Sequence, residues 1–157
     1  MTRTGEDRAT AALTASGIAF ALTRHGRVGS LAEAAAARGV EPRDIVKTLV
    51  VRRTEDDFLF VLVPGDREIS WPRLRAHLRV SRLSMPDAAT AFEVTGYERG
   101  TITPFGSSTA WPVVADVTMT GRTVSLGAGA HGVAATVAAD DVVHVLGAAV
   151  AAVTDPA

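Results

Sequence analysis

Two neighbouring apolar runs, residues 46–52 and 58–63, constrain the fold of this chain more than any other feature. The first run is rich in valine and the second in phenylalanine, leucine and valine, and their length is typical of buried strands rather than of helices. The acidic segment Glu55-Asp56-Asp57 separates them, which predicts an antiparallel hairpin. The 157-residue chain is long enough to bury a core around that hairpin, and it has no cysteine with which to form a disulfide or a thiolate metal site.

The remaining elements alternate irregularly between helix and strand. Capping residues and glycines predict helices at 5–16, 30–39, 71–78, 86–94 and 139–146. Further strands are expected at 18–22, 80–83, 112–117, 122–126 and 133–137, and residues 100–111 are expected to form a loop. Because hairpins outnumber βαβ units in this order, we predict an α+β fold. It would be a single compact domain of residues 1–157, with a core at about 8–150 and a mixed, mostly antiparallel sheet.

Lys47 lies at the start of the first apolar run and is the only lysine among sixteen basic side chains. An ammonium group in an otherwise apolar strand is costly unless it has a partner or a task. Since every other basic residue is arginine, this position is interpreted as one that needs a compact point charge with three donors. The alternative is a lysine whose side chain reaches past the strand end to water. Position and composition leave both interpretations open.

Several common functional motifs are missing or lack their usual context. The segment from Gly127 to Gly132 contains G-x-G-x-x-G, but a β-branched stretch follows it where a dinucleotide site needs a long helix. It is interpreted instead as a glycine turn or as the backbone wall of a pocket. The four histidines show no metal-ligand spacing, and neither G-x-S-x-G nor G-x-x-x-x-G-K-[ST] occurs. We therefore expect no metal, no cofactor, no serine hydrolase and no nucleoside triphosphatase.

Charge is distributed unevenly along the chain although the net charge is only −1. Fourteen of the fifteen arginines lie in residues 1–99, whereas residues 100–157 carry one arginine and four acids. A contact with a polyanion is therefore expected in the first two thirds of the chain. The densest basic stretch lies at 73–82, where arginines would share one face if the helix continued that far; a solvated helix face is the alternative.

Nothing in the sequence indicates a membrane protein or a secreted one. No apolar run approaches the roughly 18 residues of a membrane span, and the segment from Met1 to Asp7 is polar. A soluble, cytoplasmic protein is expected.

Three segments, in order, resemble a known family. They are Ile45–Val51, then Gly96-Tyr97 followed by Gly100–Gly106, and then the glycine-rich loop through Gly132. Together they resemble the YbaK/prolyl-tRNA synthetase-associated editing domains, a family of trans-acting aminoacyl-tRNA deacylases, over roughly residues 8–150. The resemblance implies a compact α+β domain with a barrel-like sheet and flanking helices. It also implies hydrolysis of the ester that joins a mischarged small amino acid to the 3′-terminal adenosine of tRNA, often a proline tRNA. The expected partners are tRNA and prolyl-tRNA synthetase, with a monomer and a homodimer both open.

The resemblance also assigns site residues. The family's lysine falls on Lys47, which is expected to be catalytic, and the loop from Gly100 to Gly106 is expected to shape the aminoacyl pocket. The expected substrate-binding residues are His25, Gly100, Thr101, Thr103, Pro104, Gly106, Gly129 and His131. The expected tRNA contacts are Arg73, Arg75, Arg79 and Arg82.

Two positions depart from the family pattern. Thr101 stands where the YbaK branch has a second glycine, and Ala134 stands where it has an acidic residue. Alanine or serine is therefore as good an expectation for the edited amino acid as the cysteine usual in that branch. The departures also leave open a module that binds aminoacyl-tRNA or a synthetase without cleaving it. A small-molecule esterase is a third interpretation.

Overall fold

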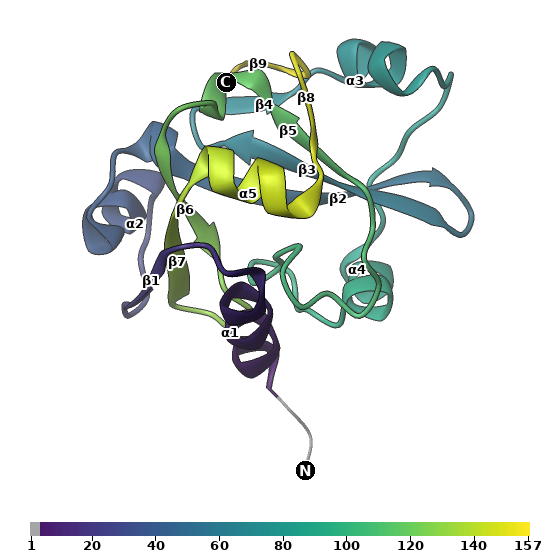
Figure 1. Ribbon diagram of the computed structural model, residues 1–157. Coiled ribbons are helices and arrows are strands. Elements are labelled where there is room, and N and C mark those ends of the chain that lie inside the picture. The colour runs from purple at the N-terminus through teal and green to yellow at the C-terminus, as the bar shows by residue number, and fades with distance from the viewer. Residues whose placement is uncertain (1–3) are drawn as a thin grey trace.

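The structure is a computed structural model that describes residues 4–157 (Figure 1). Residues 1–3, which belong to the predicted domain and to its polar N-terminal segment, lie outside the described part. The helices are α1 (Gly5–Ser16), α2 (Leu31–Arg38), α3 (Trp71–Leu78), α4 (Ala88–Thr95) and α5 (Ala139–Leu146), with 3-10 turns at Pro42–Asp44 and Val117–Met119. The strands are β1 (Phe20–Arg24), β2 (Ile45–Thr54), β3 (Asp57–Pro64), β4 (Arg67–Ile69), β5 (Val113–Asp116), β6 (Thr123–Gly127), β7 (Val133–Ala138), β8 (Ala149–Ala151) and β9 (Thr154–Pro156). None of the helices in this range is both long and apolar enough to cross a membrane.

Side chains that cap the N-terminal backbone groups fix the start of four helices. Thr4 and Asp7 form a capping box at α1, and Ser30, Ser70 and Asp87 each accept a hydrogen bond from the backbone three residues on. Such caps satisfy N–H groups that have no partner inside the helix. α1, α2 and α4 each end at a glycine with a positive φ angle, in the left-handed conformation that favours glycine. The predicted helices at 5–16, 30–39, 71–78, 86–94 and 139–146 are therefore confirmed, with small shifts at their ends.

Seven strands form one mixed sheet in the order β1-β7-β6-β2-β3-β5-β8. The pairs β1–β7, β6–β7 and β2–β3 are antiparallel, whereas β2–β6, β3–β5 and β5–β8 are parallel and short. β2 and β3 pair along nearly their whole length, which confirms the predicted hairpin. A two-stranded antiparallel ribbon, β4–β9, lies beside the main sheet.

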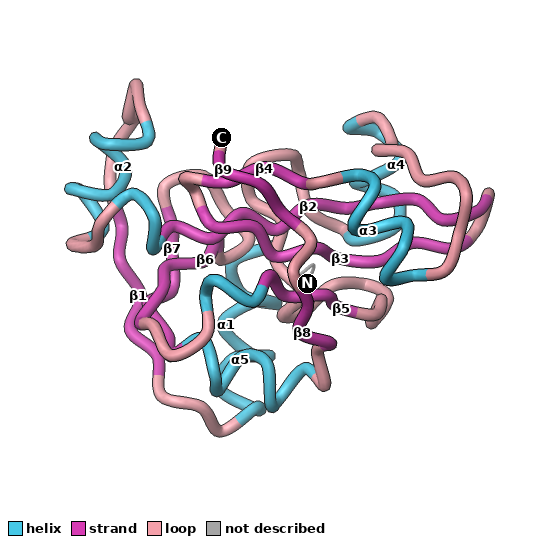
Figure 2. Tube along the Cα trace, turned by 90° about the horizontal axis from the view of Figure 1, so that it is seen from above, coloured by secondary structure: helices cyan, strands magenta, loops and turns pink. Residues whose placement is uncertain are grey.

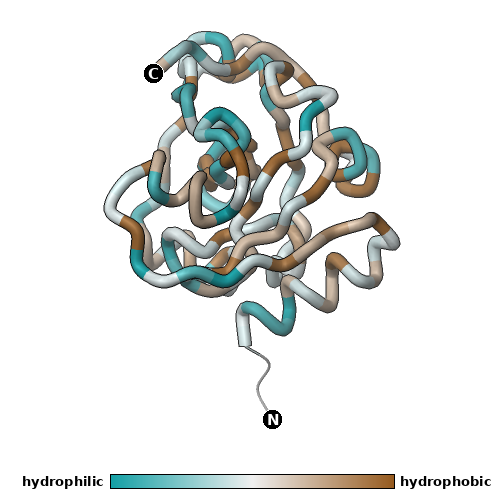
Figure 3. Tube along the Cα trace, turned by 90° about the vertical axis from the view of Figure 1, so that its left-hand side faces the viewer, coloured by the Kyte–Doolittle hydropathy of each residue, from teal (hydrophilic) through white to brown (hydrophobic). Residues whose placement is uncertain are grey.

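The sheet separates two apolar clusters. On one face, α1, α4 and α5 pack against the sheet through residues such as Leu13, Ala91 and Val142. On the other face, α3 and the residues beside the β4–β9 ribbon cover it through Leu74 and Val153. Figure 2 shows α1 and α5 together on one side of the strands. β3 is buried on both faces, which explains why its sequence is a continuous apolar run rather than an alternating one. Figure 3 colours much of the inner strands brown, whereas the first turn of α1 is teal.

Several features differ from the sequence-based prediction, which includes no strand at β4, β8 or β9. The predicted strand at 80–83 is absent, and only Ser84 forms a bridge, to Arg52 of β2. Arg79 caps α3 with a φ angle of 58°, so the helix turns away before it can align Arg75 with Arg79 and Arg82. The expected barrel closure is also not confirmed. The sheet has β1 at one edge and β8 at the other, and no pairing joins these edges within residues 4–157.

Asp116 fastens the second ribbon to the main sheet. It lies at the end of β5 with 1% of its surface exposed, and it accepts hydrogen bonds from the backbone N–H groups of Val153 and Thr118, each at 3.1 Å. The guanidinium of Arg67, in β4, lies 3.8 Å from its carboxylate. Burial favours a raised pKa for Asp116, but the hydrogen bonds from Thr118, Val153 and Thr154 outweigh it and lower the pKa below the ordinary 3.8.

We expect Asp116→Asn to lower the free energy of unfolding near pH 6 by about 1–3 kcal/mol, because the variant lacks a buried charge-assisted network. A carboxyl whose pKa is lowered by folding stabilises the protein above its unfolded pKa of about 3.8 and loses this effect as the pH falls toward its folded pKa. The difference in stability between parent and variant should therefore shrink between pH 6 and pH 3.

Denaturant unfolding monitored by tryptophan fluorescence over this pH range measures that difference. Asp155→Asn is the matched control, because Asp155 is half-exposed and its carboxylate lies 3.8 Å from Arg73. A difference between parent and Asp116→Asn that stays constant from pH 6 to pH 3 would contradict the role given to Asp116.

Candidate functional site

A small cavity of about 240 Å³ brings Lys47 together with the loop that follows α4. Gly100 and Ile102 of that loop line it, as do the start of β2, Arg38 of α2 and Gly127 of β6. Most of the lining is apolar, with Ile45, Val46 and Leu49 contributing from β2. The hydroxyl of Thr48, another lining residue, is buried and has no hydrogen-bond partner among residues 4–157. Lys47 and Gly100, which the sequence places 53 positions apart, therefore share one small cavity.

Lys47 is exposed, and its side chain has only a weak intramolecular anchor. Its ammonium group donates to the backbone carbonyl of Arg67 over 3.4 Å. No carboxylate in the described part of the chain forms an ion pair with it. Its ammonium donors therefore remain available to a bound ligand. Because Lys47 lies near the start of β2 and is exposed, its ammonium group avoids the desolvation cost of a buried charge.

Contacts from α1 fix the conformation of the loop between α4 and β5. The guanidinium of Arg8 donates to the carbonyl of Gly96 over 2.6 Å and to that of Gly106 over 3.4 Å, and it lies over the ring of Tyr97. The hydroxyl of Tyr97 in turn donates to the carbonyl of Phe105 over 2.6 Å. A Cβ at Gly106 would lie 2.5 Å from the carbonyl oxygen of Arg8, so only glycine lets the loop approach the helix this closely.

Several backbone N–H groups of this loop are already used, which limits those left for a ligand. The N–H of Thr101 donates to Glu98, that of Phe105 to Thr103, and that of Ser107 to Pro104. The N–H groups of Gly100 and Ile102 have no acceptor within residues 4–157. Both of these residues line the cavity that contains Lys47.

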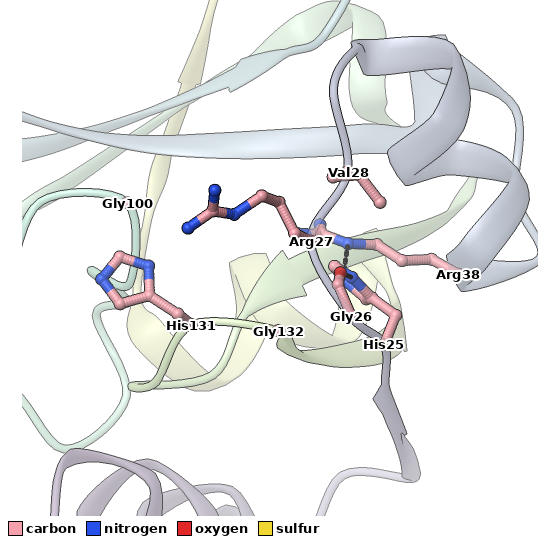
Figure 4. Close-up of a pocket in the computed structure, with 8 residues that line it drawn as sticks. All are labelled: His25, Gly26, Arg27, Val28, Arg38, Gly100, His131 and Gly132. Carbon is pink, nitrogen blue, oxygen red and sulfur yellow. Dashed lines mark hydrogen bonds between the residues drawn. The ribbon is translucent and has the colours of Figure 1, made fainter.

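A larger cavity of about 560 Å³ adjoins the first one and shares Arg38 and Gly100 with it. It is lined by the segment after β1, by α2 and by the glycine-rich loop before β7; its residues are His25, Gly26, Arg27, Val28, Arg38, Gly100, His131 and Gly132 (Figure 4). The lining contains basic side chains and glycines but no acidic residue.

Gly132 brings His25 to the edge of this cavity. The N–H of His25 donates to the carbonyl of Gly132 over 2.9 Å, and a Cβ at Gly132 would lie 2.4 Å from the carbonyl oxygen of His25. The imidazole Nδ1 lies 2.8 Å from the carbonyl of Gly26. Because a carbonyl only accepts, this contact requires the proton on Nδ1, which leaves Nε2 to accept from the Nε of Arg38 over 3.4 Å.

The other predicted substrate-binding residues divide into two groups. Gly129, His131 and Thr101 line a third cavity of about 340 Å³, next to Tyr97 and Arg8. His131 is exposed, and its Nε2 lies 3.4 Å from the carboxylate of Glu98. Thr103 and Pro104 are buried inside the loop, and Gly106 contacts Arg8 and Tyr97. Thr103, Pro104 and Gly106 therefore contribute to the internal packing of the loop.

The two departures from the family pattern are also built into the interior. The hydroxyl of Thr101 donates to the carbonyl of Glu98 over 2.8 Å, and Thr101 is 3% exposed. Ala134 is buried in β7, where it pairs with Thr23 and Gly127.

The predicted basic helix contributes to a groove at the far end of the β2–β3 hairpin. Arg75 and Arg82 line a cavity of about 420 Å³ together with Arg52 and Arg53 of β2 and one acidic residue, Glu55. We call these four arginines the basic groove. Arg73 lies instead 3.8 Å from Asp155, and Arg79 ends α3. The guanidinium Nε of Arg52 is buried without a hydrogen-bond partner in the described chain, whereas Arg53 lies 3.5 Å from Asp57.

Sequence reasoning did not single out Arg38, Arg27 or Arg8. Arg38 is the last residue of an alanine-rich helix, where a basic residue is commonly a surface cation that complements the helix dipole. Its position in two cavities depends on long-range packing that no local pattern reveals.

Comparison with known proteins identifies the family. A family model for the aminoacyl-tRNA editing domain matches residues 25–145. Proline–tRNA ligases are similar over part of the chain. The ligase of Kosmotoga olearia is 36% identical over 80 residues, 51% of this chain and 14% of the ligase; that of Thermosipho africanus is 40% identical over 65 residues, 41% of this chain and 11% of the ligase. The matched segments thus make up about one seventh or less of the length of these ligases.

Solved structures agree with the fold over nearly the whole chain. The crystal structure of a hypothetical protein superimposes with a TM-score of 0.85 at 26% identity and covers 94% of this chain and 99% of that one. A second structure, described as that of a candidate trans-editing enzyme for prolyl-tRNA synthetase, superimposes with a TM-score of 0.87 at 23% identity and covers 99% of each chain. The single α+β domain predicted from sequence is confirmed, and so is the resemblance. The chain belongs to the aminoacyl-tRNA editing domain family.

Proposed function

We propose that this protein is an aminoacyl-tRNA deacylase that removes a mischarged small amino acid from tRNA. The observation that carries the proposal is the 240 Å³ cavity, in which Lys47 meets Gly100 and Ile102 within a chain of the editing-domain family. The other lining residues give it a mainly apolar wall.

The proposed reaction is hydrolysis of the ester at the 3′ end of tRNA. Water adds to the ester carbonyl, the bond between the acyl carbon and the ribose oxygen breaks, and that oxygen takes up a proton. The products are the free amino acid, whose carboxyl group releases a proton at neutral pH, and tRNA with its hydroxyl restored. This reaction needs an oriented water and stabilisation of negative charge that develops on the carbonyl oxygen.

The cavity offers groups for these tasks without a protein nucleophile. Lys47 supplies a positive charge that anchors the acceptor end, and the free N–H groups of Gly100 and Ile102 polarise the ester carbonyl. The terminal ribose hydroxyl next to the ester positions the attacking water.

The edited amino acid is proposed to be small. The cavity of about 240 Å³, bordered by Ile45, Leu49 and Ile102, has ample room for alanine, serine or cysteine, the amino acids that the family resemblance favours. Thr101 does not fill this cavity, because its hydroxyl is directed to Glu98. Since the curated relatives are proline–tRNA ligases, we propose proline tRNA as the carrier, editing in trans beside prolyl-tRNA synthetase, in the cytoplasm.

We expect Lys47→Ala to lower the rate of deacylation by about 10²–10³, the usual effect of removing one electrostatic contact to a developing charge. Its stability should stay within about 0.5 kcal/mol of the parent, because Lys47 is exposed and makes one weak hydrogen bond. The measurement is deacylation of proline and alanine tRNAs charged with Ala, Ser, Cys, Thr or Pro, together with thermal unfolding.

Arg43→Ala is the matched control for removal of a cation. Arg43 lies four residues before Lys47, is exposed and pairs with Glu41. Deacylation by Lys47→Ala at the parental rate, on every substrate that the parent cleaves, would rule out the role of Lys47. Tight binding of charged tRNA by the parent without turnover would favour a non-catalytic module instead.

We propose that the basic groove binds the phosphates of tRNA. Replacing Arg75 and Arg82 together with Gln should weaken tRNA binding and lower the slope of log affinity against log salt by about 0.7–0.9 for each phosphate that the variant no longer neutralises. The preference among amino acids should not change, because the groove is lined by residues other than those around Lys47. Binding titrations over a range of salt concentrations around the physiological one provide this slope.

A double variant of Arg43 and Arg122, both to Gln, removes the same number of charges outside the groove. The parental slope in the Arg75/Arg82 variant, or an equally reduced slope in this control, would argue against the groove as a specific phosphate-binding surface.

A further inference from the structure

Arg38 is a half-buried arginine whose charge has no partner of opposite sign. It ends α2, and within residues 4–157 no carboxylate lies within 4.0 Å of its guanidinium. Its two side-chain contacts are to neutral groups at the long limit for hydrogen bonds, the Nε2 of His25 and the hydroxyl of Ser125, each at 3.4 Å. Burial lowers the pKa of Arg38, which reflects a charged form that is poorly solvated.

No acidic residue close to Arg38 along the chain pairs with it. Glu33 accepts from the N–H of Gly29, Glu41 pairs with Arg43, and Asp44 forms no ion pair with Arg38. A guanidinium has five donors, and Arg38 uses two of them. A partly desolvated cation with free donors gains stability when an anion binds to it.

The location of Arg38 shows where that anion would lie. Arg38 is one of two residues that line both the large cavity and the cavity containing Lys47, the other being Gly100. The large cavity also holds His25, Arg27 and His131, and the side chain of Arg27 extends into the space between Arg38 and His131 (Figure 4). No acidic residue lines either cavity; Glu98 lines the neighbouring third cavity and contacts His131.

We propose that Arg38 and Arg27 form a phosphate subsite, which binds the phosphodiester on the 5′ side of the terminal adenosine while the ester occupies the cavity with Lys47. This proposal rests on the proposed function. An aminoacyl ester has no carboxylate, so the nearest anion to the reacting group is the 5′-phosphate of the same nucleoside. A guanidinium is suited to it because its planar fork binds two phosphate oxygens at once.

His25 acts as a positioning residue in this subsite. Its Nδ1 is tied to the carbonyl of Gly26, so that its Nε2 faces the Nε of Arg38 as an acceptor (Figure 4). This contact uses the donor at the base of the fork and leaves an Nη group that has no acceptor among residues 4–157. The guanidinium of Arg38 is therefore held through its Nε, while one of its Nη groups is free to bind an anion.

The test uses a nonhydrolysable analogue, 3′-deoxy-3′-alanylaminoadenosine, prepared with and without a 5′-phosphate. In the parent, the 5′-phosphate should raise affinity about 10- to 100-fold, as expected for hydrogen bonds to a charged group. In Arg38→Gln this increment should largely disappear, so that the analogues with and without the 5′-phosphate bind with similar affinities. Arg38→Lys should keep part of the increment, because it retains the charge but not the fork. Titration calorimetry measures all of these affinities.

Arg43→Gln is the control and should keep the full increment, because Arg43 is exposed and paired with Glu41. The proposal is overturned if Arg38→Gln retains the increment, if it loses affinity for both analogues equally, or if the parent shows no increment. Thermal unfolding of each variant separates weaker binding from a smaller folded fraction.

Binding of AMP separates this proposal from the proposed function. If the parent fails to deacylate any charged tRNA but binds AMP in a manner that depends on Arg38, the phosphate subsite stands and the deacylase does not. If the parent deacylates tRNA but its affinity for AMP and for the phosphorylated analogue is unchanged in Arg38→Gln, the deacylase stands and the subsite does not.

Discussion

The register of β2 against β3 is the constraint on which the candidate site depends. Lys47 pairs with Val63, and Val46 and Val50, on the opposite face of β2, enter the core with α1, α4 and α5. Because side chains alternate along a strand, a slip by one residue would exchange the two faces. It would move Lys47 toward the core and expose the valines. β3 resists such a slip, since it is buried on both faces between β2 and β5. Burial of the hairpin therefore fixes the position of the lysine, although the lysine contributes little to stability.

The loop that lines the cavity together with Lys47 is shaped by contacts from outside the sheet. Arg8 of α1 holds both ends of the segment from Gly96 to Gly106, and Tyr97 closes it from within. The N–H groups at Thr101, Phe105 and Ser107 are consumed by this internal bonding, which leaves those of Gly100 and Ile102 at the cavity. A loop fixed in this way presents donors in one arrangement before a ligand binds, which is what electrostatic stabilisation of a reacting carbonyl requires.

Much of the fold could be predicted because its signals are local. Caps at Ser30 and Ser70 and the apolar hairpin mark elements without reference to the rest of the chain. The errors arise where tertiary context decides. Residues 80–83 look like a strand, but Arg79 adopts a left-handed conformation and only Ser84 reaches β2. Likewise, family motifs indicated Lys47 and Gly100, which do share a cavity. Arg38 gave no signal, since an arginine at the end of an alanine-rich helix is ordinary until packing buries it.

The arrangement of charge partners is more informative than the net charge of −1. Arg24, Arg43, Arg53 and Arg73 each lie beside an acid and are partly or well exposed, and such pairs contribute little to stability. Arg38 shows the opposite combination: it is half-buried and has no acid beside it. A glutamate at a lining position of the large cavity would neutralise it and relieve the cost of burial. No lining position holds a glutamate. Binding sites commonly contain residues that lower the stability of the fold and are retained because they bind a ligand. A bound anionic ligand supplies the negative charge that no lining residue provides for Arg38. The absence of an acid beside Arg38 and the proposed phosphate subsite therefore follow from the same electrostatic argument.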